Sequence, residues 1–65
     1  MTLAERIKAF RAKNNLSQLK FGELCRLNRV YNNEIENGRK EPGDMAKLKI
    51  ELVLNGERIT DEELL

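Results

Sequence analysis

The chain has 65 residues, of which 40% are hydrophobic and 35% are charged, with one proline and four glycines. A chain of this length buries only about 60% of the surface that its unfolded form exposes, which predicts one small domain, residues 1–65, with a thin margin of stability. The composition excludes disordered and collagen-like chains. No apolar run approaches the ~18 residues needed to span a bilayer, and the first residues lack the apolar core of a signal peptide. We therefore expect no membrane contact and a cytoplasmic protein.

Two absences argue against an enzyme. The chain has no histidine, which removes the usual general base and the usual metal ligand. Its single cysteine, Cys25, permits neither an internal disulfide nor a multi-cysteine metal site. Cys25 follows Leu24 and precedes Arg26-Leu27, and this apolar setting favours an inert core thiol over a reactive one. We expect no catalysis, no metal and no cofactor.

The net charge of +1 conceals an asymmetry along the chain. Residues 1–40 have nine Lys and Arg against four Glu, a net charge of +5. Residues 41–65 have three Lys and Arg against seven acidic residues, a net charge of −4. The basic part indicates a surface that meets an anion, although ordinary solvated faces remain the alternative on charge alone.

The first predicted helix begins after Thr2. Leu3, Ile7 and Phe10 recur at helical spacing. Thr2 with Glu5 three residues later is the sequence of a capping box. The polar pair at 14–15, two asparagines, ends this helix.

Two short helices are predicted next, over residues 17–25 and 28–37, with Ser17 and Asn28 as N-cap candidates. The second of them ends at Asn37-Gly38, and residues 38–43 have the composition of a loop. Their apolar positions are Leu16, Phe21, Leu24 and Cys25 for the first helix and Tyr31 and Ile35 for the second.

The last third of the chain has two interpretations. Asp44 is a candidate cap for a helix that Asn55-Gly56 would close, with apolar positions at Met45, Leu48, Leu52 and Val53. Alternation over residues 48–54 together with Asn-Gly instead indicates a β-hairpin with strands at 48–54 and 57–60. The alternation breaks at Val53, which favours the helix. Thr60 and Glu63 form a further capping-box sequence, which predicts a short final helical turn.

The predicted helices at 17–25 and 28–37 are about three residues apart, which is the spacing of a helix-turn-helix, whose second helix lies in the major groove of DNA. Leu16-Ser17-Gln18, Phe21-Gly22 and Ile35-Glu36-Asn37-Gly38, with Pro42 following, resemble the phage Cro/repressor family of DNA-binding domains. Small antitoxins and restriction–modification controllers share this pattern. The similarity covers about residues 3–42 and continues weakly through Leu48, Ile50 and Leu54. It implies an all-α, lambda-repressor-like bundle of four to five helices.

The resemblance also implies an ion pair between Arg11 and Glu36, which would link the first helix to the end of the third. Two unrelated surface charges are the alternative. Gly22 stands where the family has a small residue because two helices cross closely.

Two residues depart from the family pattern. Arg26 occupies the turn position that is usually glycine, and a left-handed backbone there costs a non-glycine residue roughly 1–2 kcal/mol. Asn32 replaces a branched aliphatic residue on the inner side of the third helix. We expect Tyr31 and Ile35 to supply that inner side, with Asn32 near its edge.

With Tyr31 and Ile35 turned inward, helical geometry turns four residues outward, and the resemblance places base readers at the same positions. Arg29 suits guanine O6 and N7, Asn33 suits adenine N6 and N7, Val30 a thymine methyl and Glu34 a cytosine amino group. Phosphate contact by Arg29 and mere surface shielding by Glu34 are the alternatives. Contacts with the phosphate backbone are expected from Gln18 at the amide end of its helix and, after the third helix, from Asn37, Arg39 and Lys40, although a merely solvated loop is the alternative for Arg39-Lys40. Asn28 completes the set of DNA-contacting residues.

The resemblance thus implies a sequence-specific DNA-binding transcriptional regulator of the Cro/repressor type, with either sign of regulation. One such module contacts only a short half-site, so we expect a homodimer on a near-palindromic operator in double-stranded DNA. Candidate dimer contacts are Val53, Leu54, Ile59, Leu64 and Leu65, unless these residues only close the core. In the hairpin interpretation, strands within residues 48–59 would pair between chains. Two alternatives remain. One is an antitoxin of the same fold that binds a toxin protein, and the other is a protein–protein adaptor that does not bind DNA. The adaptor is favoured by Arg26, Asn32 and the near-neutral net charge.

Overall fold

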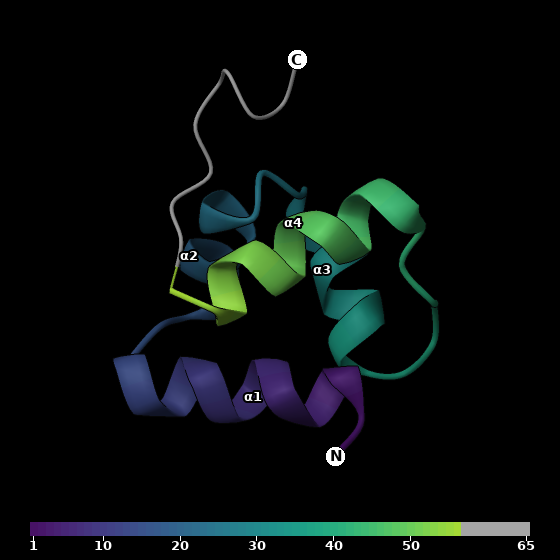
Figure 1. Ribbon diagram of the computed structural model, residues 1–65. Coiled ribbons are helices and arrows are strands. Elements are labelled where there is room, and N and C mark those ends of the chain that lie inside the picture. The colour runs from purple at the N-terminus through teal and green to yellow at the C-terminus, as the bar shows by residue number, and fades with distance from the viewer. Residues whose placement is uncertain (57–65) are drawn as a thin grey trace.

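The computed structural model describes residues 1–56, which form four helices: α1 (Leu3–Asn14), α2 (Gln18–Leu24), α3 (Arg29–Glu36) and α4 (Asp44–Leu54). In Figure 1, α1 runs along one side of the molecule and α4 passes in front of α2 and α3. These residues contain no strand, so the all-helical prediction is confirmed for them and the hairpin interpretation is wrong at residues 48–54. The second predicted strand, at 57–60, and the final helical turn lie outside the described residues. No helix within residues 1–56 is long and apolar enough to cross a membrane.

Local hydrogen bonds set the starts of the first three helices, as the sequence predicts. Thr2 Oγ1 accepts from the Glu5 backbone N–H at 3.2 Å, and the Thr2 N–H donates to Glu5 Oε1 at 2.9 Å, which completes the capping box. The hydrogen bond from the Thr2 backbone N–H lowers the pKa of the Glu5 carboxyl, and the Thr2 side chain lowers it further. Ser17 Oγ accepts from the Lys20 N–H at 3.0 Å, and Asn28 caps α3 in the same way. Each side chain satisfies a backbone donor that has no partner within the helix.

The start of α4 differs from the sequence prediction. Gly43 is the N-cap and makes no side-chain hydrogen bond, while Asp44 is the first helical residue. Asp44 therefore acts through its charge near the positive end of the helix rather than as the cap itself. At the other end, Gly56 has φ of +82° and its N–H donates to Val53 O at 2.9 Å, a glycine stop of the usual kind.

The turn after α2 places Arg26 in the left-handed region, with φ of 57°. The following N–H, that of Leu27, donates to Gly22 O at 2.8 Å and closes the end of α2. A Cβ on Gly22 would lie 3.2 Å from Leu27 O and 3.8 Å from Asn32 Cβ. The turn and α3 therefore approach α2 too closely at Gly22 for a larger residue to fit without a shift of the backbone.

The core lies between all four helices. Its buried hydrophobic members are Ile7, Phe21, Cys25, Ile35, Ile50 and Val53. Phe10 lines its edge, where its ring meets that of Phe21 edge-on at 5.8 Å between centroids. The thiol of Cys25 is enclosed in this core, and burial raises its pKa to about 12. Cys25 is thus a core thiol, in the setting that its apolar neighbours indicate.

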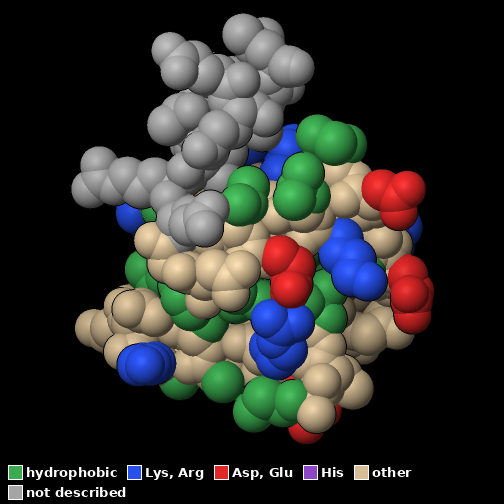
Figure 2. Space-filling view, in the orientation of Figure 1, with side chains coloured by type: hydrophobic (Ala, Val, Ile, Leu, Met, Phe, Trp, Pro, Cys, Tyr) green, Lys and Arg blue, Asp and Glu red, His purple; other side chains and the backbone are tan. Residues whose placement is uncertain are grey.

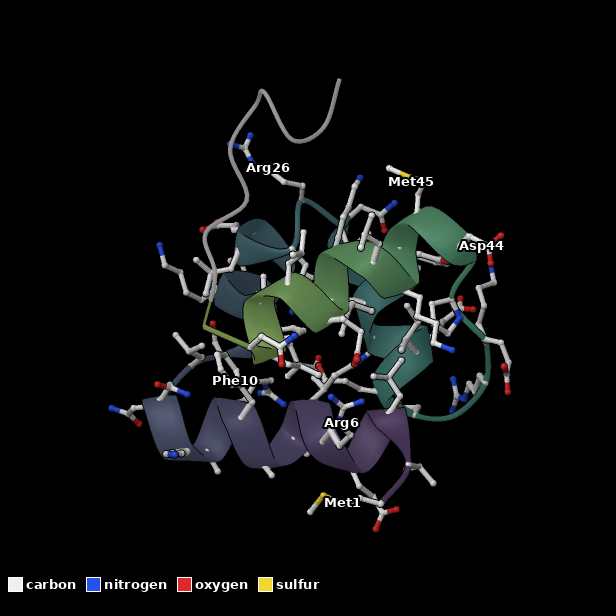
Figure 3. All side chains as sticks on the ribbon, in the orientation of Figure 1. Met1, Arg6, Phe10, Arg26, Asp44 and Met45 are labelled. Carbon is white, nitrogen blue, oxygen red and sulfur yellow. The ribbon has the colours of Figure 1, made fainter. Side chains whose placement is uncertain are left out.

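The outer side of α4 combines apolar and charged residues. Met45 and Leu48 are 54% and 52% exposed, and Figure 2 shows hydrophobic side chains at the surface over this helix. Arg6 reaches from α1 to Glu51 on α4, with 2.7 Å between Arg6 Nη1 and Glu51 Oε1, and Figure 3 shows Arg6 between these two helices. Both partners of this ion pair are more than one-third exposed.

Candidate nucleic-acid interface

The outer side of α3 is accessible, most of all at its first turn. Arg29 and Val30 form its first turn and are exposed, Val30 to 68%. Asn33 and Glu34, one turn later, are half-buried. All four residues that the sequence predicted as outward-facing are therefore accessible on one side of one helix, while Ile35 faces the core.

A shallow hollow of about 420 Å³ lies beside this turn, lined by Asn28, Arg29, Val30, Tyr31, Glu34 and Lys40. Asn28 has a structural role here, because its Oδ1 accepts from the Tyr31 N–H at 2.8 Å and starts α3. The side-chain oxygen of Asn28 thus already accepts one hydrogen bond, and within residues 1–56 both N–H groups of its amide remain available as donors for the predicted DNA contact.

The loop after α3 carries the two cations predicted as phosphate contacts. Arg39 is exposed, and its backbone N–H donates to Glu34 O at 2.9 Å, which holds the start of the loop against α3. Lys40 lies over the Tyr31 ring, with Nζ 5.5 Å from the centroid, and Nζ is 4.0 Å from Glu34 Oε2. Lys40 therefore offsets the one negative charge on this side of α3.

Three side-chain amides connect α2 to the outer side of α3. Asn33 Nδ2 donates to Gln18 Oε1 at 2.9 Å, and Asn37 Nδ2 donates to Asn33 Oδ1 at 3.0 Å. The sequence predicts each of these three residues as a DNA contact, but it does not predict the hydrogen bonds between them. The bond from Asn33 to Gln18 joins residues 15 positions apart, which no local sequence pattern indicates.

The buried polar cluster behind this surface consists of Arg11, Asn32 and Glu36. Arg11 Nη1 donates to Glu36 Oε1 at 2.7 Å, so the two residues that the resemblance paired are in contact. The Glu36 side chain is completely buried, and its Oε2 accepts from Asn32 Nδ2 at 3.2 Å. This cluster ties α1 to the inner side of α3.

The expected place of Asn32 at the edge of the inner side is wrong. Asn32 is completely buried and lies at the contact of α3 with α2, where its Nδ2 also donates to Gln18 O at 3.2 Å. A polar side chain is accepted at this depth because a carboxylate and a backbone carbonyl both take its amide protons. Its Oδ1 is buried without a hydrogen-bond partner, so the site is only partly satisfied.

The predicted dimer contacts are divided between the core and the undescribed end of the chain. Val53 is 5% exposed and belongs to the core of the single chain, and Leu54 is half-buried against it. Val53 therefore has almost no surface left for a partner. Ile59, Leu64 and Leu65 lie outside the described residues.

Within residues 1–56, no three acidic or cysteine side chains gather as a metal-binding group. The accessible groups of the α3 surface are hydrogen-bond donors and acceptors, positive charges and the carboxylate of Glu34. Comparison of the chain with protein-family models, curated proteins and solved structures finds no match.

Proposed function

We propose that this protein is a sequence-specific DNA-binding regulator in which α2 and α3 act as a helix-turn-helix of the Cro/repressor type. In this proposal α3 enters the major groove and its first turn meets the base edges. The observation that carries the proposal is the exposed first turn of α3, where Arg29 and Val30 project beside the basic loop of Arg39 and Lys40.

The two kinds of contact fall to different residues. Arg29 can donate two hydrogen bonds to guanine O6 and N7, which reads a base pair. Arg39, on the exposed loop, meets phosphate, which strengthens binding to every sequence alike. Because one domain covers only a short half-site, we propose that two copies bind a near-palindromic operator.

The test is retention of a random-sequence DNA duplex pool at about 50 and 200 mM salt, followed by sequencing of the retained duplexes. We expect enrichment of a palindrome with binding that weakens steeply as salt rises. Arg29→Ala should lose discrimination at one base pair of each half-site. Arg39→Ala should weaken all sequences alike and flatten the salt slope by about 0.9 for each phosphate that Arg39 neutralises.

Lys47→Ala is the matched control, because it removes one exposed positive charge from α4 rather than from the α3 surface. This variant should retain the palindrome and the salt slope. If Arg29→Ala and Arg39→Ala bind like the unaltered protein, the proposed placement of α3 is wrong.

A protein-binding function without DNA is the second candidate. The exposed Met45 and Leu48 on α4 favour it, because apolar side chains at the surface often mark contacts with other proteins. Absence of salt-sensitive DNA retention at both salt concentrations would support this candidate over the regulator.

A further inference from the structure

Gln18, the first residue of α2, is held by α3 at two places. Asn32 Nδ2 donates to its backbone oxygen at 3.2 Å in the interior, and Asn33 Nδ2 donates to its side-chain Oε1 at 2.9 Å nearer the surface. Two consecutive residues of α3 thus fix the main chain and the side chain of the same residue. A half-buried glutamine held in this way has lost most of its rotamer freedom before any ligand arrives.

The hydrogen bonds couple the orientation of the Gln18 amide to those of Asn33 and Asn37. Asn33 Oδ1 accepts from Asn37 Nδ2 at 3.0 Å, and Asn33 directs its nitrogen toward Gln18. If the Gln18 amide alone were reversed, its NH₂ would face the NH₂ of Asn33, and no hydrogen bond could form between them. In this arrangement of the three amides, Gln18 Oε1 lies on the side of α3.

The remaining hydrogen-bonding groups of the Gln18 amide form a donor–acceptor pair. Oε1 retains a second lone pair, and both N–H groups of Nε2 are without a partner within residues 1–56. Asn33 has fewer groups left, since one N–H of its nitrogen and one lone pair of its oxygen are already bonded to other side chains, whereas both N–H groups of Gln18 are free within this range. A donor beside an acceptor matches the major-groove edge of adenine, which accepts at N7 and donates at N6.

We propose that Gln18 is the residue that reads adenine and that Asn33 is a positioning residue that orients the Gln18 amide. This reverses the roles expected from the sequence and its resemblance, in which Asn33 reads adenine and Gln18 meets phosphate. The inference rests on the proposed DNA-binding function and adds the base and the residue that recognises it.

The experiment compares the sequences that each variant selects from the random duplex pool at one salt concentration. The variants are Gln18→Ala, Asn33→Ala, the Gln18→Ala/Asn33→Ala double variant and Asn33→Asp. Asn14→Ala is the control, because Asn14 makes one exposed hydrogen bond, to Phe10 O, on α1. Circular dichroism confirms that each variant is folded before selection.

The unaltered protein should select adenine at one position of each half-site. Gln18→Ala should reduce this preference roughly 5- to 150-fold, the range for removal of one bidentate bond to a base. Asn33→Ala should reduce the preference at the same position, and the double variant should reduce it no further than Gln18→Ala alone. Asn14→Ala should leave it unchanged.

Asn33→Asp tests orientation directly. A carboxylate at this position only accepts, so the Gln18 amide should turn its nitrogen toward it and reverse the displayed donor and acceptor. The adenine preference should then disappear although the shape and size of residue 33 are nearly kept. A merely structural role of Asn33 would change affinity without changing which base is selected.

Three results would overturn the inference while DNA binding itself is retained, and a fourth would also refute the proposed function. If Asn33→Ala and Gln18→Ala lose discrimination at different positions, Asn33 reads a base itself. If Gln18→Ala weakens all sequences alike while the motif persists, Gln18 contacts phosphate. If the unaltered protein is retained by DNA but selects no motif, no residue reads a base, whereas absence of retention at any salt concentration refutes the proposed function as well.

Discussion

The ion pair of Arg11 with Glu36 should contribute far more to stability than the ion pair of Arg6 with Glu51. The two arginines lie on the same helix, and both pairs have 2.7 Å between nitrogen and oxygen. Their environments differ, since the Glu36 side chain is completely buried whereas Glu51 is 36% exposed. Replacing each arginine by methionine removes the charge and keeps most of the apolar stem.

Arg11→Met leaves the Glu36 carboxylate buried, with Asn32 Nδ2 as its other hydrogen-bond donor. Leaving one partner of a buried pair behind costs about 3–5 kcal/mol. Arg11 Nε is itself buried without a partner, and its removal relieves part of this cost, so we expect about 3 kcal/mol. Arg6→Met exposes Glu51 to water and should cost about 0–1 kcal/mol. A chain of this length has a total stability of about 3–10 kcal/mol, so the first variant loses a large share of it.

The assay is thermal and urea unfolding followed by circular dichroism at pH 7. For a domain of this size each kcal/mol shifts the Tm by about 4–8 °C, so Arg11→Met should lower the Tm by about 12–24 °C and Arg6→Met by no more than about 8 °C. Adding Glu36→Gln to Arg11→Met should recover part of the stability, because the buried group is then neutral. Equal destabilisation by the two arginine variants, or no recovery in the double variant, would refute the reasoning from the buried charge.

Three further predictions concern single positions. Arg26→Gly should raise stability by up to ~1.5 kcal/mol, because it removes a left-handed penalty of roughly 1–2 kcal/mol against an entropic cost of about 0.5–1 kcal/mol; a lower urea midpoint would contradict this. Gly22→Ala should lower stability by about 1–3 kcal/mol although alanine favours helices, since its Cβ would lie 3.2 Å from the backbone oxygen of Leu27; an unchanged Tm would contradict this. Burial raises the pKa of Cys25 from 9.0 to about 12, so the unfolded chain loses the thiol proton at a lower pH than the folded chain. The free energy of unfolding should therefore fall between pH 9 and pH 12, and this thiol should cause no pH dependence below pH 9. A Cys25→Ser variant should lack this part of the pH dependence, and the native thiol at pH 8 should react with iodoacetamide far more slowly than in urea.

The helix starts were predictable from sequence because they depend on residues three apart. Thr2 and Glu5 form a capping box, and Ser17 and Asn28 cap α2 and α3, whatever the rest of the molecule does. The exception, Asp44, shows the limit of this reasoning. Asp44 is a good capping residue, but the helix begins one residue earlier than the sequence predicts, so Gly43 is the N-cap and Asp44 is the first helical residue.

The place of Asn32 was not predictable, because it depends on partners brought together by the fold. Its amide bonds to Glu36 on the same helix and to the backbone of Gln18, 14 positions away. A polar residue on the inner side of a helix normally indicates the edge of the core, and only a buried carboxylate beside it changes that expectation. The bond from Asn33 to Gln18 was missed for the same reason, while the outward side of α3 followed directly from helical geometry.

The buried cluster behind α3 restricts the substitutions that this chain can accept over time. An apolar pair of similar volume in place of Arg11 and Glu36 is often as stable as the ion pair. Reaching that pair one substitution at a time, however, passes through a chain with one uncompensated buried charge. In a domain with so few residues this intermediate lies close to unfolding. Positions 11 and 36 should therefore change together or not at all.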